Sequence, residues 1–414
     1  MLGLPTNYWR LWGSSAVSNL ADGIFFIALP LLAVRLTDSP LLVAGVAIAG
    51  RLPWLFFVLI AGALADRLDR RKVMRNVQLL RVAIMAVLAG LALVDGLSLI
   101  VLYAAAIALG IGETLFDTSA QSIMPAIVGK DQLPLANGRL YGVELITNQF
   151  VGPPLGGLLI AVSIPLALGS SLVGYALAAV GLTLIVGSFR ARRDGPPTRL
   201  TTDIAEGLRY LLGHRVLRTL ALMVGVINLA SAAAFAVFVL YAVEPGPMGL
   251  SEPAFGVLLT TFALGSVIGS LSAARLETRF GRIPVLFTCV VASAVSTAVP
   301  AFTANAFIVG ASFVVGGLLA IVWNVITVSL RQRIIPDHLL GRVNSAYRLL
   351  AWGTQPVGAL LGGLIGQFVG LPAVFLFGGL VTLLLLFTRP ILTEAALVLA
   401  EREGQPAPAG TANA

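Results

Sequence analysis

Four acidic residues lie inside long apolar segments of this sequence: Asp22, Glu113, Asp117 and Glu144. Placing an ionised side chain at the centre of a bilayer costs roughly 2.5 to 3.5 kcal/mol on insertion scales, so such a residue needs a functional or structural reason. A carboxyl group in that position can take up and release a proton. Glu113 and Asp117 are four residues apart and therefore share one helical face. We interpret the four acids as candidates for proton coupling.

Each acid also has a structural interpretation, in which a basic residue neutralises it. Asp22 lies about three turns from the end of its apolar segment, and Arg51 lies at a comparable depth in the next segment, so the two are a candidate ion pair. Glu113 is the acid nearest to the middle of its segment, which favours coupling. Three basic residues are candidate partners of Glu144: Arg81, Arg139 and Arg348.

The elements that hold these acids are predicted to cross a membrane. Hydrophobic residues make up 58% of the 414 positions and charged residues 11%, and the mean hydropathy of +0.95 exceeds what a water-soluble core accommodates. A helix needs roughly 20 apolar residues to span about 30 Å of hydrocarbon. The sequence therefore predicts an all-α membrane protein with twelve transmembrane helices. The expected spans are 11–35, 41–64, 74–94, 97–120, 138–161, 165–189, 217–242, 254–274, 283–302, 305–329, 343–368 and 371–388.

The excess of positive charge indicates the orientation in the membrane. The net charge is +8, and the basic residues cluster in alternate connections between spans, as the positive-inside rule describes. The intervening connections contain only Arg35. We therefore expect both termini in the cytoplasm, a location in the bacterial inner membrane, and no nucleic-acid partner. The clusters are Arg67 to Arg75, Arg190 to Arg218, Arg275 to Arg282 and Arg331 to Arg342.

An internal repeat divides the chain into two halves. The segment Gln149 to Leu158 recurs as Gln355 to Leu364 at an offset of 206 residues. The basic loop at Arg67 to Arg71 aligns with Arg275 to Arg279 at an offset of 208. Two landmarks with nearly the same period indicate a duplicated six-helix unit. The predicted domains are an N-terminal bundle at 1–189, a cytoplasmic linker at 190–216, a C-terminal bundle at 217–390 and a cytoplasmic tail at 391–414.

The polar segments and the single cysteine add little chemistry. In the linker, an amphipathic helix is predicted at Thr202 to Leu212, opened by a cap at Asp203. The tail becomes rich in Ala, Pro and Gly, and we expect it to be disordered beyond about Glu403. Cys289 lies in an apolar run and is interpreted as a packing residue. The sequence has no metal-ligand spacing.

Segments of the first span, the first basic loop and the fourth span carry a resemblance to a known superfamily. They are Asn19 to Gly23, Gly62 to Lys72, Gly112-Glu113 and Phe116-Asp117. Through them the chain resembles the major facilitator superfamily over roughly residues 8–390, and within it the bacterial exporters of macrolides and catecholate siderophores. The resemblance implies two six-helix bundles that rock about a central cavity, so that the cavity opens to alternate sides of the membrane.

The same resemblance implies a conformational latch in the first basic loop. In the superfamily an acid and an arginine of this loop pair with neighbouring helix ends, which implies that role for Asp66 and Arg70. An acid at the position of Asp117 commonly contacts the loop arginine. The alternative is that the loop charges only set the orientation of the chain. The expected latch residues are Gly62, Asp66, Arg70, Arg71 and Asp117.

Two departures from the superfamily pattern affect this latch. Asp69 stands where the superfamily usually has glycine, although Asp tolerates a left-handed turn better than most residues. Ala274 is opposite Asp66 in the second copy of the loop. We therefore expect a weaker latch in the C-terminal half.

The fifth span contains a segment, Gly152 to Gly157, that resembles the antiporter motif of exporters. Its glycines permit close helix packing, and its first proline removes a backbone donor and bends the helix. The motif favours export, with generic packing as the alternative. The arginine that many proton-coupled drug exporters place in the fourth span is absent from residues 103–112, so their proton relay does not transfer directly. The expected packing residues are Gly152, Pro153, Gly156 and Gly157.

Polar and aromatic residues within the spans are candidates for the substrate cavity. An aromatic residue in a span is also commonly a packing residue or an interfacial anchor. The candidates are Asn19, Arg51, Asn148, Trp323, Tyr347, Trp352 and Gln355.

These features together predict a secondary transporter. The sequence has no GxxxxGK[ST] loop and no catalytic constellation, so we expect neither an enzyme nor a cofactor. The predicted function is proton-coupled efflux of amphiphilic small molecules, such as drugs or macrolides, by a monomer in the lipid bilayer. One alternative is a dedicated exporter of a siderophore, another natural product or a lysolipid. A rival from a different class is a membrane sensor that does not transport.

Overall fold

The computed structural model describes residues 3–57, 68–129, 132–187, 189 and 200–404. These residues are almost entirely helical and form no β-sheet. Eleven of the described helical segments are long and apolar enough to cross a membrane, and α2 (Pro40–Phe56) is a shorter apolar helix. They correspond to the twelve predicted spans and confirm the expected fold class.

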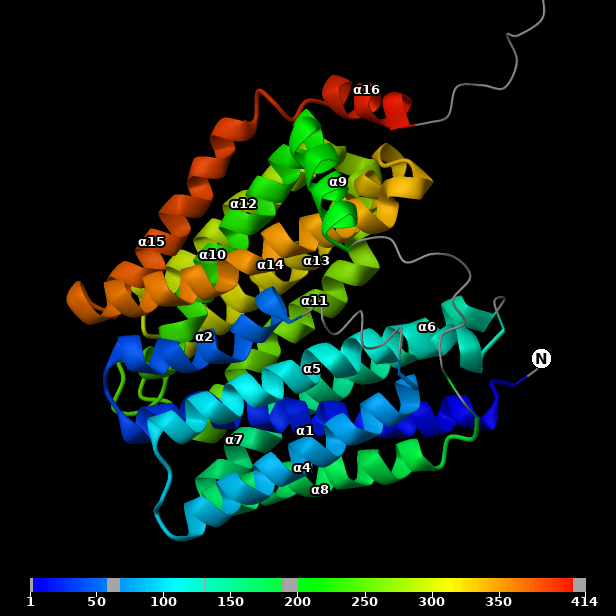
Figure 1. Cartoon of the computed structure of the whole chain (residues 1–414). Coiled ribbons are helices and arrows are strands. Elements are labelled where there is room, and N and C mark those ends of the chain that lie inside the picture. Colours follow the sequence, from blue (N-terminus) through cyan, green and yellow to red (C-terminus); the bar gives the residue numbers. More distant parts are fainter. Residues whose placement is uncertain (1–2, 58–67, 130–131, 188, 190–199, 405–414) are drawn as a thin grey trace, which may run out of the picture.

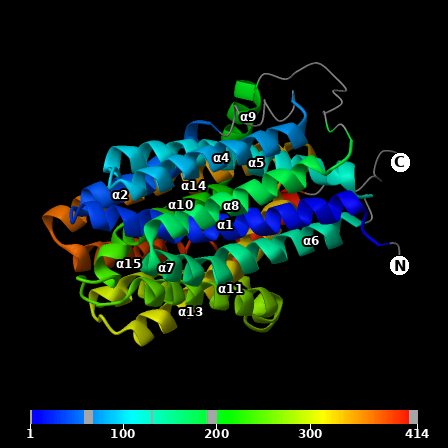
Figure 2. The ribbon, with the colours of Figure 1, turned by 90° about the horizontal axis from the view of Figure 1, so that it is seen from below.

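The two halves lie one above the other in Figure 1, with the N-terminal half (blue to green) below the C-terminal half (green to red), and Figure 2 shows them from below. The N-terminal half contains α1 (Thr6–Leu36), α2, α4 (Arg70–Leu93), α5 (Leu99–Ile127), α6 (Leu133–Glu144), η2 (Leu145–Val151), α7 (Gly152–Val162) and α8 (Ile164–Thr183). The C-terminal half contains α10 (Arg215–Ala242), α11 (Glu252–Phe280), α12 (Arg282–Ala298), η3 (Val299–Ala301), α13 (Ala306–Ile334), α14 (Asp337–Phe368), α15 (Leu371–Leu383) and η4 (Leu384–Thr388). Two further helices lie outside the spans: α9 (Leu200–Gly213) and α16 (Glu394–Gly404).

Polar residues in the connections fix where several spans begin. The Ser98 hydroxyl accepts a 3.4 Å hydrogen bond from the Val101 N–H at the start of α5. The Asn305 side chain accepts a 2.9 Å hydrogen bond from the Phe307 N–H at the start of α13. Such caps satisfy backbone donors that have no partner within the helix. These two spans therefore begin where a polar connection meets an apolar run, which is why hydropathy located them.

The fifth span is interrupted by η2, a π-helical segment between α6 and α7. Pro153 lies in the first turn of α7 and has no backbone N–H, so it cannot complete the regular hydrogen-bond ladder with the preceding turn. Single π-turns within α-helices often accompany functional sites. The interruption lies where the sequence predicted a bend, but its π-helical geometry did not follow from the sequence.

The glycines of the fifth span bring α7 against helices of both halves. A Cβ atom at Gly156 would lie 2.7 Å from the carbonyl oxygen of Ile24 in α1, and Gly152 packs on α1 in the same way. A Cβ atom at Gly157 would overlap the carbonyl group of Glu252, at the start of α11. Only glycine permits backbones to approach this closely. The helix α7 is therefore packed between the first span of its own half and the second span of the other half.

The second copy of the repeat makes the equivalent contacts. A Cβ atom at Gly362 in α14 would overlap the carbonyl group of Ala233 in α10. A Cβ atom at Gly363 would lie 2.9 Å from Cβ of Ala44 in α2. In each copy the first glycine faces its own half and the second faces the other half. Two crosswise contacts, α7 with α11 and α14 with α2, therefore join the halves.

Polar contacts reinforce this junction at one end of the molecule, which we call the closed end. Arg35 at the end of α1 and Glu252 at the start of α11 form an ion pair of 2.6 Å. The Ser39 hydroxyl before α2 donates a 2.7 Å hydrogen bond to the Gln367 side chain near the end of α14. Both contacts link the two halves. The closed end is thus held by backbone packing and by polar side chains.

The linker helix α9 forms where it was expected but begins at Leu200. Asp203 therefore lies within its first turn. The prediction that Asp203 is the N-cap is wrong. Glu206 of α9 forms an ion pair with Arg342 of α14. A Cβ atom at Gly207 would overlap the backbone of the same arginine. The linker helix is consequently fixed to the C-terminal half.

The tail begins with a helix, α16, that the sequence did not predict. Leu397 and Ala400 of this helix are buried against the C-terminal half. Arg282, at the start of α12, forms ion pairs with Glu394 and with Glu401, the latter at 2.6 Å. The apolar run of this helix, Ala395 to Ala400, is too short to span a membrane, so hydropathy alone did not mark it as a docked element. The residues after 404, which we expected to be disordered, lie outside the described part of the chain.

The structure also changes the register of the repeated loop. The helix α4 begins after Asp69 and α12 begins after Gly281, so the offset between the equivalent caps is 212 residues and not 208. Arg282, and not Thr278, thus corresponds to Arg70. Gly281 has a left-handed φ of 82°, whereas Asp69 has a φ of −71° and caps α4 through its side chain. The expected left-handed turn at Asp69 is therefore wrong, because a side-chain cap replaces it.

The close packing of α7 on α11 predicts the effect of a larger residue at Gly157. Gly157→Val should lower the melting temperature of the detergent-solubilised protein, because overpacking typically costs about 1 to 3 kcal/mol. Gly169 in α8 has no atom within 4 Å of an added Cβ, so Gly169→Val is the matched control. Melting followed by far-UV circular dichroism tests this. Equal melting temperatures of the two variants would contradict the assigned contact.

Candidate substrate and proton site

A cavity of about 170 Å³, which we call the interface cavity, lies between the two halves. Its wall combines two acids, one arginine, one amide and two tryptophans, which α2, α5 and α14 provide. The lining residues are Arg51, Trp54, Glu113, Asp117, Trp352 and Gln355. All except Trp54 are site residues that the sequence predicted, so the fold brings five of them together.

Close packing of α5 on α2 places the two acids beside Arg51. A Cβ atom at Gly110 of α5 would lie 2.5 Å from the carbonyl oxygen of Gly50 in α2. Glu113 and Asp117 follow Gly110 by about one and two helical turns. They therefore line the same cavity as Arg51, which directly follows Gly50.

An aromatic contact closes the cavity wall across the two halves. The rings of Trp54 in α2 and Trp352 in α14 meet edge to face, with centroids 5.2 Å apart and an interplanar angle of 84°. The guanidinium carbon of Arg348 lies 4.9 Å from the centroid of the Trp352 ring. These contacts are individually modest in energy. They are suited to a wall that separates when the two halves move.

The charged groups of the interface cavity are not fixed by one another. Within the described residues, Arg51, Glu113 and Asp117 take part in no ion pair within 4 Å. Arg51 lines the same cavity as both acids. The side chain of Glu113 is exposed and lines the interface cavity. Both acids are therefore able to accept a proton or to contact a cation without first breaking a salt bridge.

The expected ion pair of Asp22 with Arg51 is wrong, because Arg81 of α4 is the partner. Arg81 Nη1 lies 3.2 Å from Asp22 Oδ1, and the hydroxyl of Tyr175 in α8 donates a 2.8 Å hydrogen bond to the same oxygen. Arg81 is only 3% exposed and also donates to the Ser18 hydroxyl at 3.3 Å. The helices α4 and α8 cover this face of α1, so Arg51 in α2 is not its neighbour. Asp22 is held in a fixed polar network.

Glu144, the last residue of α6, has none of its expected partners. Arg81 pairs with Asp22, and Arg348 lies over a tryptophan ring. Arg139 lies with its guanidinium carbon 5.6 Å from the centroid of the Trp9 ring. Among the described residues no ion pair reaches Glu144. Its side chain is exposed and does not line the interface cavity.

The described part of the basic loop ties the start of α4 to the segment after α8. The Arg70 N–H donates a 3.4 Å hydrogen bond to the Phe189 carbonyl. The Arg71 side chain donates to the Ile185 carbonyl. The Asp69 side chain accepts a 3.3 Å hydrogen bond from the Phe189 N–H. These contacts lie within the N-terminal half and fasten its third span to its sixth.

The other latch residues give a mixed result. Gly62 and Asp66 lie outside the described residues. The contact of Asp117 with a loop arginine, which the resemblance implied, is not formed with Arg70 or Arg71 in the described structure. Asp117 lines the interface cavity because it points to the same side of α5 as Glu113. We therefore assign it to the cavity.

Two predicted cavity residues have other positions. The Asn19 amide donates a 2.9 Å hydrogen bond to the Ser15 carbonyl one turn earlier in α1. Asn148 lies in η2, where its carbonyl oxygen would be 2.5 Å from a Cβ atom at Gly23. Neither residue lines the cavities described for this structure. Asn19 bonds within its own helix, and the backbone of Asn148 packs on α1 at Gly23.

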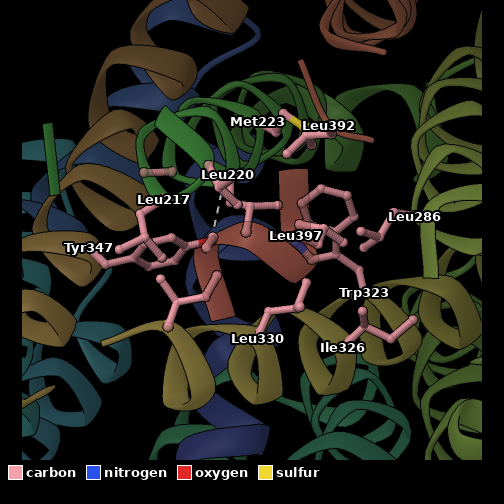
Figure 3. Packing of buried hydrophobic residues seen from close by; sticks show 14 of the residues in the cluster. Leu217, Leu220, Met223, Leu286, Trp323, Ile326, Leu330, Tyr347, Leu392 and Leu397 are labelled. Atoms are coloured by element: carbon pink, nitrogen blue, oxygen red, sulfur yellow. Dashed lines mark hydrogen bonds between the residues drawn. The ribbon is translucent and has the colours of Figure 1, made fainter. Parts of the chain in front are cut away.

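The remaining predicted residues, Trp323 and Tyr347, line a second cavity inside the C-terminal half. Figure 3 shows these two side chains at the sides of a large buried apolar cluster. The Tyr347 hydroxyl donates a 3.3 Å hydrogen bond to the Leu220 carbonyl, drawn as the dashed line. Trp352 lines both cavities. The predicted aromatic residues therefore divide between two adjoining spaces.

Sequence reasoning missed the roles of Arg81, Tyr175 and Trp54. Arg81 carried a signal, because it is an arginine followed by a long apolar run in α4, and such a cation needs an acid. Tyr175 and Trp54 carried none, because aromatic residues are common in spans. Only the packing of α1, α4 and α8 identified Arg81 and Tyr175 as partners of Asp22.

Comparison with known proteins places this architecture in one family. Residues 5–405 match the family described as transmembrane secretion effector. The chain belongs to this family of the major facilitator superfamily. It is a multi-pass membrane transporter and not an enzyme.

Relatives within the family include two kinds of exporter. The multidrug efflux pump Tap of Mycolicibacterium fortuitum is 29% identical over 90% of this chain and 92% of its own length. Tap of Mycobacterium tuberculosis (strain ATCC 25618 / H37Rv) is 30% identical over 86% of both chains. The enterobactin exporter EntS of Salmonella typhimurium is 28% identical over 84% of this chain and 83% of its own.

Solved transporters share the fold at much lower identity. A bacterial homologue of the iron transporter ferroportin, in an inward-facing state, has a TM-score of 0.72 and 17% identity, and the match covers 96% of this chain and 99% of that one. The nucleoside transporter NupG has a TM-score of 0.73 and 14% identity, with 93% and 98% covered. These matches establish the shared architecture alone.

The pair of Arg81 and Asp22 predicts a stability effect. Arg81→Gln should lower the melting temperature, because leaving one charge of a buried pair alone costs about 3 to 5 kcal/mol, and less where, as for Asp22, the side chain is 29% exposed. Adding Asp22→Asn should recover part of the loss. Arg75→Gln, on the same helix, is the control. Circular dichroism melting and gel filtration measure the effect. If the melting temperature of Arg81→Gln equals that of the wild type, the pair does not stabilise the fold.

Proposed function

We propose that this chain is a proton-coupled secondary exporter of amphiphilic small molecules, in which Glu113 and Asp117 exchange protons as the interface cavity opens to alternate sides. The observation that carries the proposal is the position of these acids. They line a space between two halves, beside Arg51, and no ion pair within the described residues holds them. Transport requires such a site to be loaded and emptied in each cycle.

The choice of Glu113 and Asp117 over Asp22 follows from their neighbours. The Asp22 carboxylate already pairs with the buried Arg81 guanidinium and accepts a hydrogen bond from the Tyr175 hydroxyl, so contact with a cargo would first require breaking this network. Glu113 and Asp117 are one helical turn apart, so their charges repel and a proton shared between them relieves the repulsion. Asp22 then serves to hold α1 against α4 and α8.

Proton movement supplies enough energy for export. One proton crossing about 100 mV releases about 2.3 kcal/mol, and half a pH unit adds roughly 0.7. Together these allow about 100-fold accumulation of a neutral solute, since each tenfold step needs about 1.4 kcal/mol. An exchange of one proton for a monovalent cation cancels the voltage contribution and leaves only that of the pH gradient.

The cavity chemistry favours an amphiphilic cation as cargo. Two carboxyl groups outnumber the single guanidinium of Arg51, and the faces of Trp54 and Trp352 offer cation–π contacts. Multidrug efflux by the relatives named Tap is consistent with this cargo. The relative EntS exports a siderophore, and an anionic siderophore would need more positive charge than this cavity provides. Siderophore export is therefore the second candidate.

The proposed orientation places the closed end outside the cytoplasm. The basic connections lie at the opposite ends of the spans, and the positive-inside rule assigns them to the cytoplasm. Both termini are then cytoplasmic, in the inner membrane of a bacterium. The contacts at Arg35 and Ser39 hold the outer side shut in this conformation.

The proton assignment predicts the behaviour of Glu113→Gln. In inverted membrane vesicles with an imposed pH gradient, doxorubicin, which combines an aromatic ring system with a protonated aliphatic amine, should dissipate the gradient through the wild-type protein. Glu113→Gln should reduce this response by at least tenfold, because an amide cannot exchange a proton. Asp117→Asn should reduce it to a smaller extent, since Glu113 remains.

Glu277→Gln, an acid of α11 outside the cavity, is the matched control and should respond as the wild type does. Gel filtration establishes that each variant is folded. Normal dissipation by Glu113→Gln would overturn the assignment. The absence of a wild-type response to doxorubicin, ethidium and macrolides alike would support the non-transporting sensor instead.

A further inference from the structure

Two of the arginines that the structure describes are buried: Arg81, which is 3% exposed, and Arg331, which is 8% exposed. Arg81 has partners, because it pairs with Asp22 and donates to the Ser18 hydroxyl. Arg331, in the last turn of α13, has neither an ion pair nor a side-chain hydrogen bond within the described part of the chain. A buried charge without a counter-ion is strongly unfavourable, so Arg331 needs a partner that these residues do not provide.

Two helices cover the end of α13 and bring acids to it, but these acids pair with other arginines. Glu401 of α16 lies 2.6 Å from Arg282 and 3.6 Å from Arg333. Glu206 of α9 pairs with Arg342. A ligand that carries a negative charge is therefore the remaining means of neutralising the buried arginine.

The guanidinium of Arg331 is held in a position that leaves its outer edge available. Its central carbon lies 3.8 Å from the centroid of the Tyr347 ring in α14, and the Tyr347 hydroxyl donates to the Leu220 carbonyl. Nε is enclosed and has no partner, whereas the two terminal nitrogens, which also have none, reach accessible space. A guanidinium that is stacked on a ring keeps its in-plane donors free, and two of them can hold a carboxylate or a phosphate through parallel hydrogen bonds.

The place of α13 in the fold relates this arginine to the acids of the other half. The helix α13 packs on α11 and α12, as α5 packs on α2 and α4, so α5 and α13 are equivalent spans of the two halves. The span α5 carries Glu113 and Asp117, whereas α13 carries Arg331. Arg331 lies towards the end opposite the closed end, where cargo enters in the proposed orientation. Equivalent spans therefore present opposite charges.

A second arginine adds positive charge beside this one. Arg348 directly follows Tyr347 in α14, is exposed, and forms no ion pair among the described residues. Its guanidinium carbon lies 4.9 Å from the centroid of the Trp352 ring. Trp352 and Tyr347 line the second cavity together, and Trp352 also lines the interface cavity. Two cations, neither paired with a carboxylate, are thus held on aromatic rings of one helix next to the site of transport.

We propose that Arg331, assisted by Arg348, binds an anionic group of the cargo, a carboxylate or a phosphate. The inference rests on the proposed function, because Glu113 and Asp117 take the positive group. It narrows the substrate class to zwitterionic amphiphiles. Such a molecule meets negative charge in the N-terminal half and positive charge in the C-terminal half, whereas a simple cation engages only the acids.

Norfloxacin and its ethyl ester test the anion subsite. Norfloxacin is an aromatic zwitterion with a carboxylate and a protonated amine, and the ester lacks only the negative charge. Arg331→Gln should raise the Kd of the purified protein for norfloxacin about 10- to 100-fold, as expected for lost hydrogen bonds to a charged group. It should change the Kd for the ester less than twofold. The fluorescence anisotropy of the two compounds, with the protein in detergent, gives both values.

Three further variants separate binding from folding. Arg275→Gln removes an exposed arginine of α11 and, as the matched control, should change neither Kd. Arg331→Lys keeps the charge but not the paired donors, and should recover part of the norfloxacin affinity. Arg331→Gln should melt no lower than the wild type, because it removes an unpaired buried charge. If it does not fold, Arg348→Gln decides the question, with an expected rise of about 2- to 5-fold for norfloxacin alone.

The outcomes distinguish this inference from the proposed function. Equal wild-type Kd values for norfloxacin and its ester, or equal losses for both in Arg331→Gln, would overturn the anion subsite and leave proton-coupled export intact. Phosphatidylglycerol that displaces norfloxacin from the wild type and not from Arg331→Gln would assign the arginine to a lipid headgroup, and would also overturn it. A loss of affinity confined to norfloxacin would establish the subsite even if Glu113→Gln transports normally.

Discussion

The structure depends on close backbone contacts that glycine pairs make between the two halves. Gly157 seats α7 on α11, and Gly363 seats α14 on α2, so each half contributes one span to a contact with the other. In lipid there is little hydrophobic drive for helix association, and close van der Waals packing takes its place. The energy of van der Waals contacts falls steeply with distance. They therefore hold the halves together at the closed end and leave the rest of their length free to separate. That property suits a transporter whose halves must rock.

The cost of charge in lipid explains how the polar groups are divided. Asp22 and Arg81 neutralise each other inside the N-terminal half, with Tyr175 and Ser18 completing the network. Glu113 and Asp117 are instead placed at the boundary between the halves, where a cavity supplies space and a nearby cation. The first group stabilises a bundle, and the second remains available for exchange. Acidic residues within the spans therefore have two roles: Asp22 stabilises a bundle, whereas Glu113 and Asp117 line a cavity. The ion-pair partners of each acid distinguish the two roles.

The two halves have diverged in how they secure the ends of their spans. In the N-terminal half, Asp69 and Arg71 bind the backbone after α8. In the C-terminal half, Arg282 binds carboxylates of α16, a helix that follows the last span. The weaker latch that we expected in the C-terminal half stays a prediction, because Asp66 lies outside the described residues. Duplication preserved the helices, while the polar contacts at their ends were built separately.

The sequence by itself determined the number of spans, the two halves and the four candidate acids, because hydropathy, repetition and the rarity of charge in lipid are properties of residues in order. It did not determine which acid pairs with which base. Asp22 meets Arg81 and not Arg51, and Asp117 meets the cavity and not the loop, because these outcomes depend on which faces of α1, α4, α5 and α8 come into contact. The second cavity, inside the C-terminal half, and α16 were likewise decided by tertiary packing, since a cavity between helices and a docked helix arise only when distant segments meet.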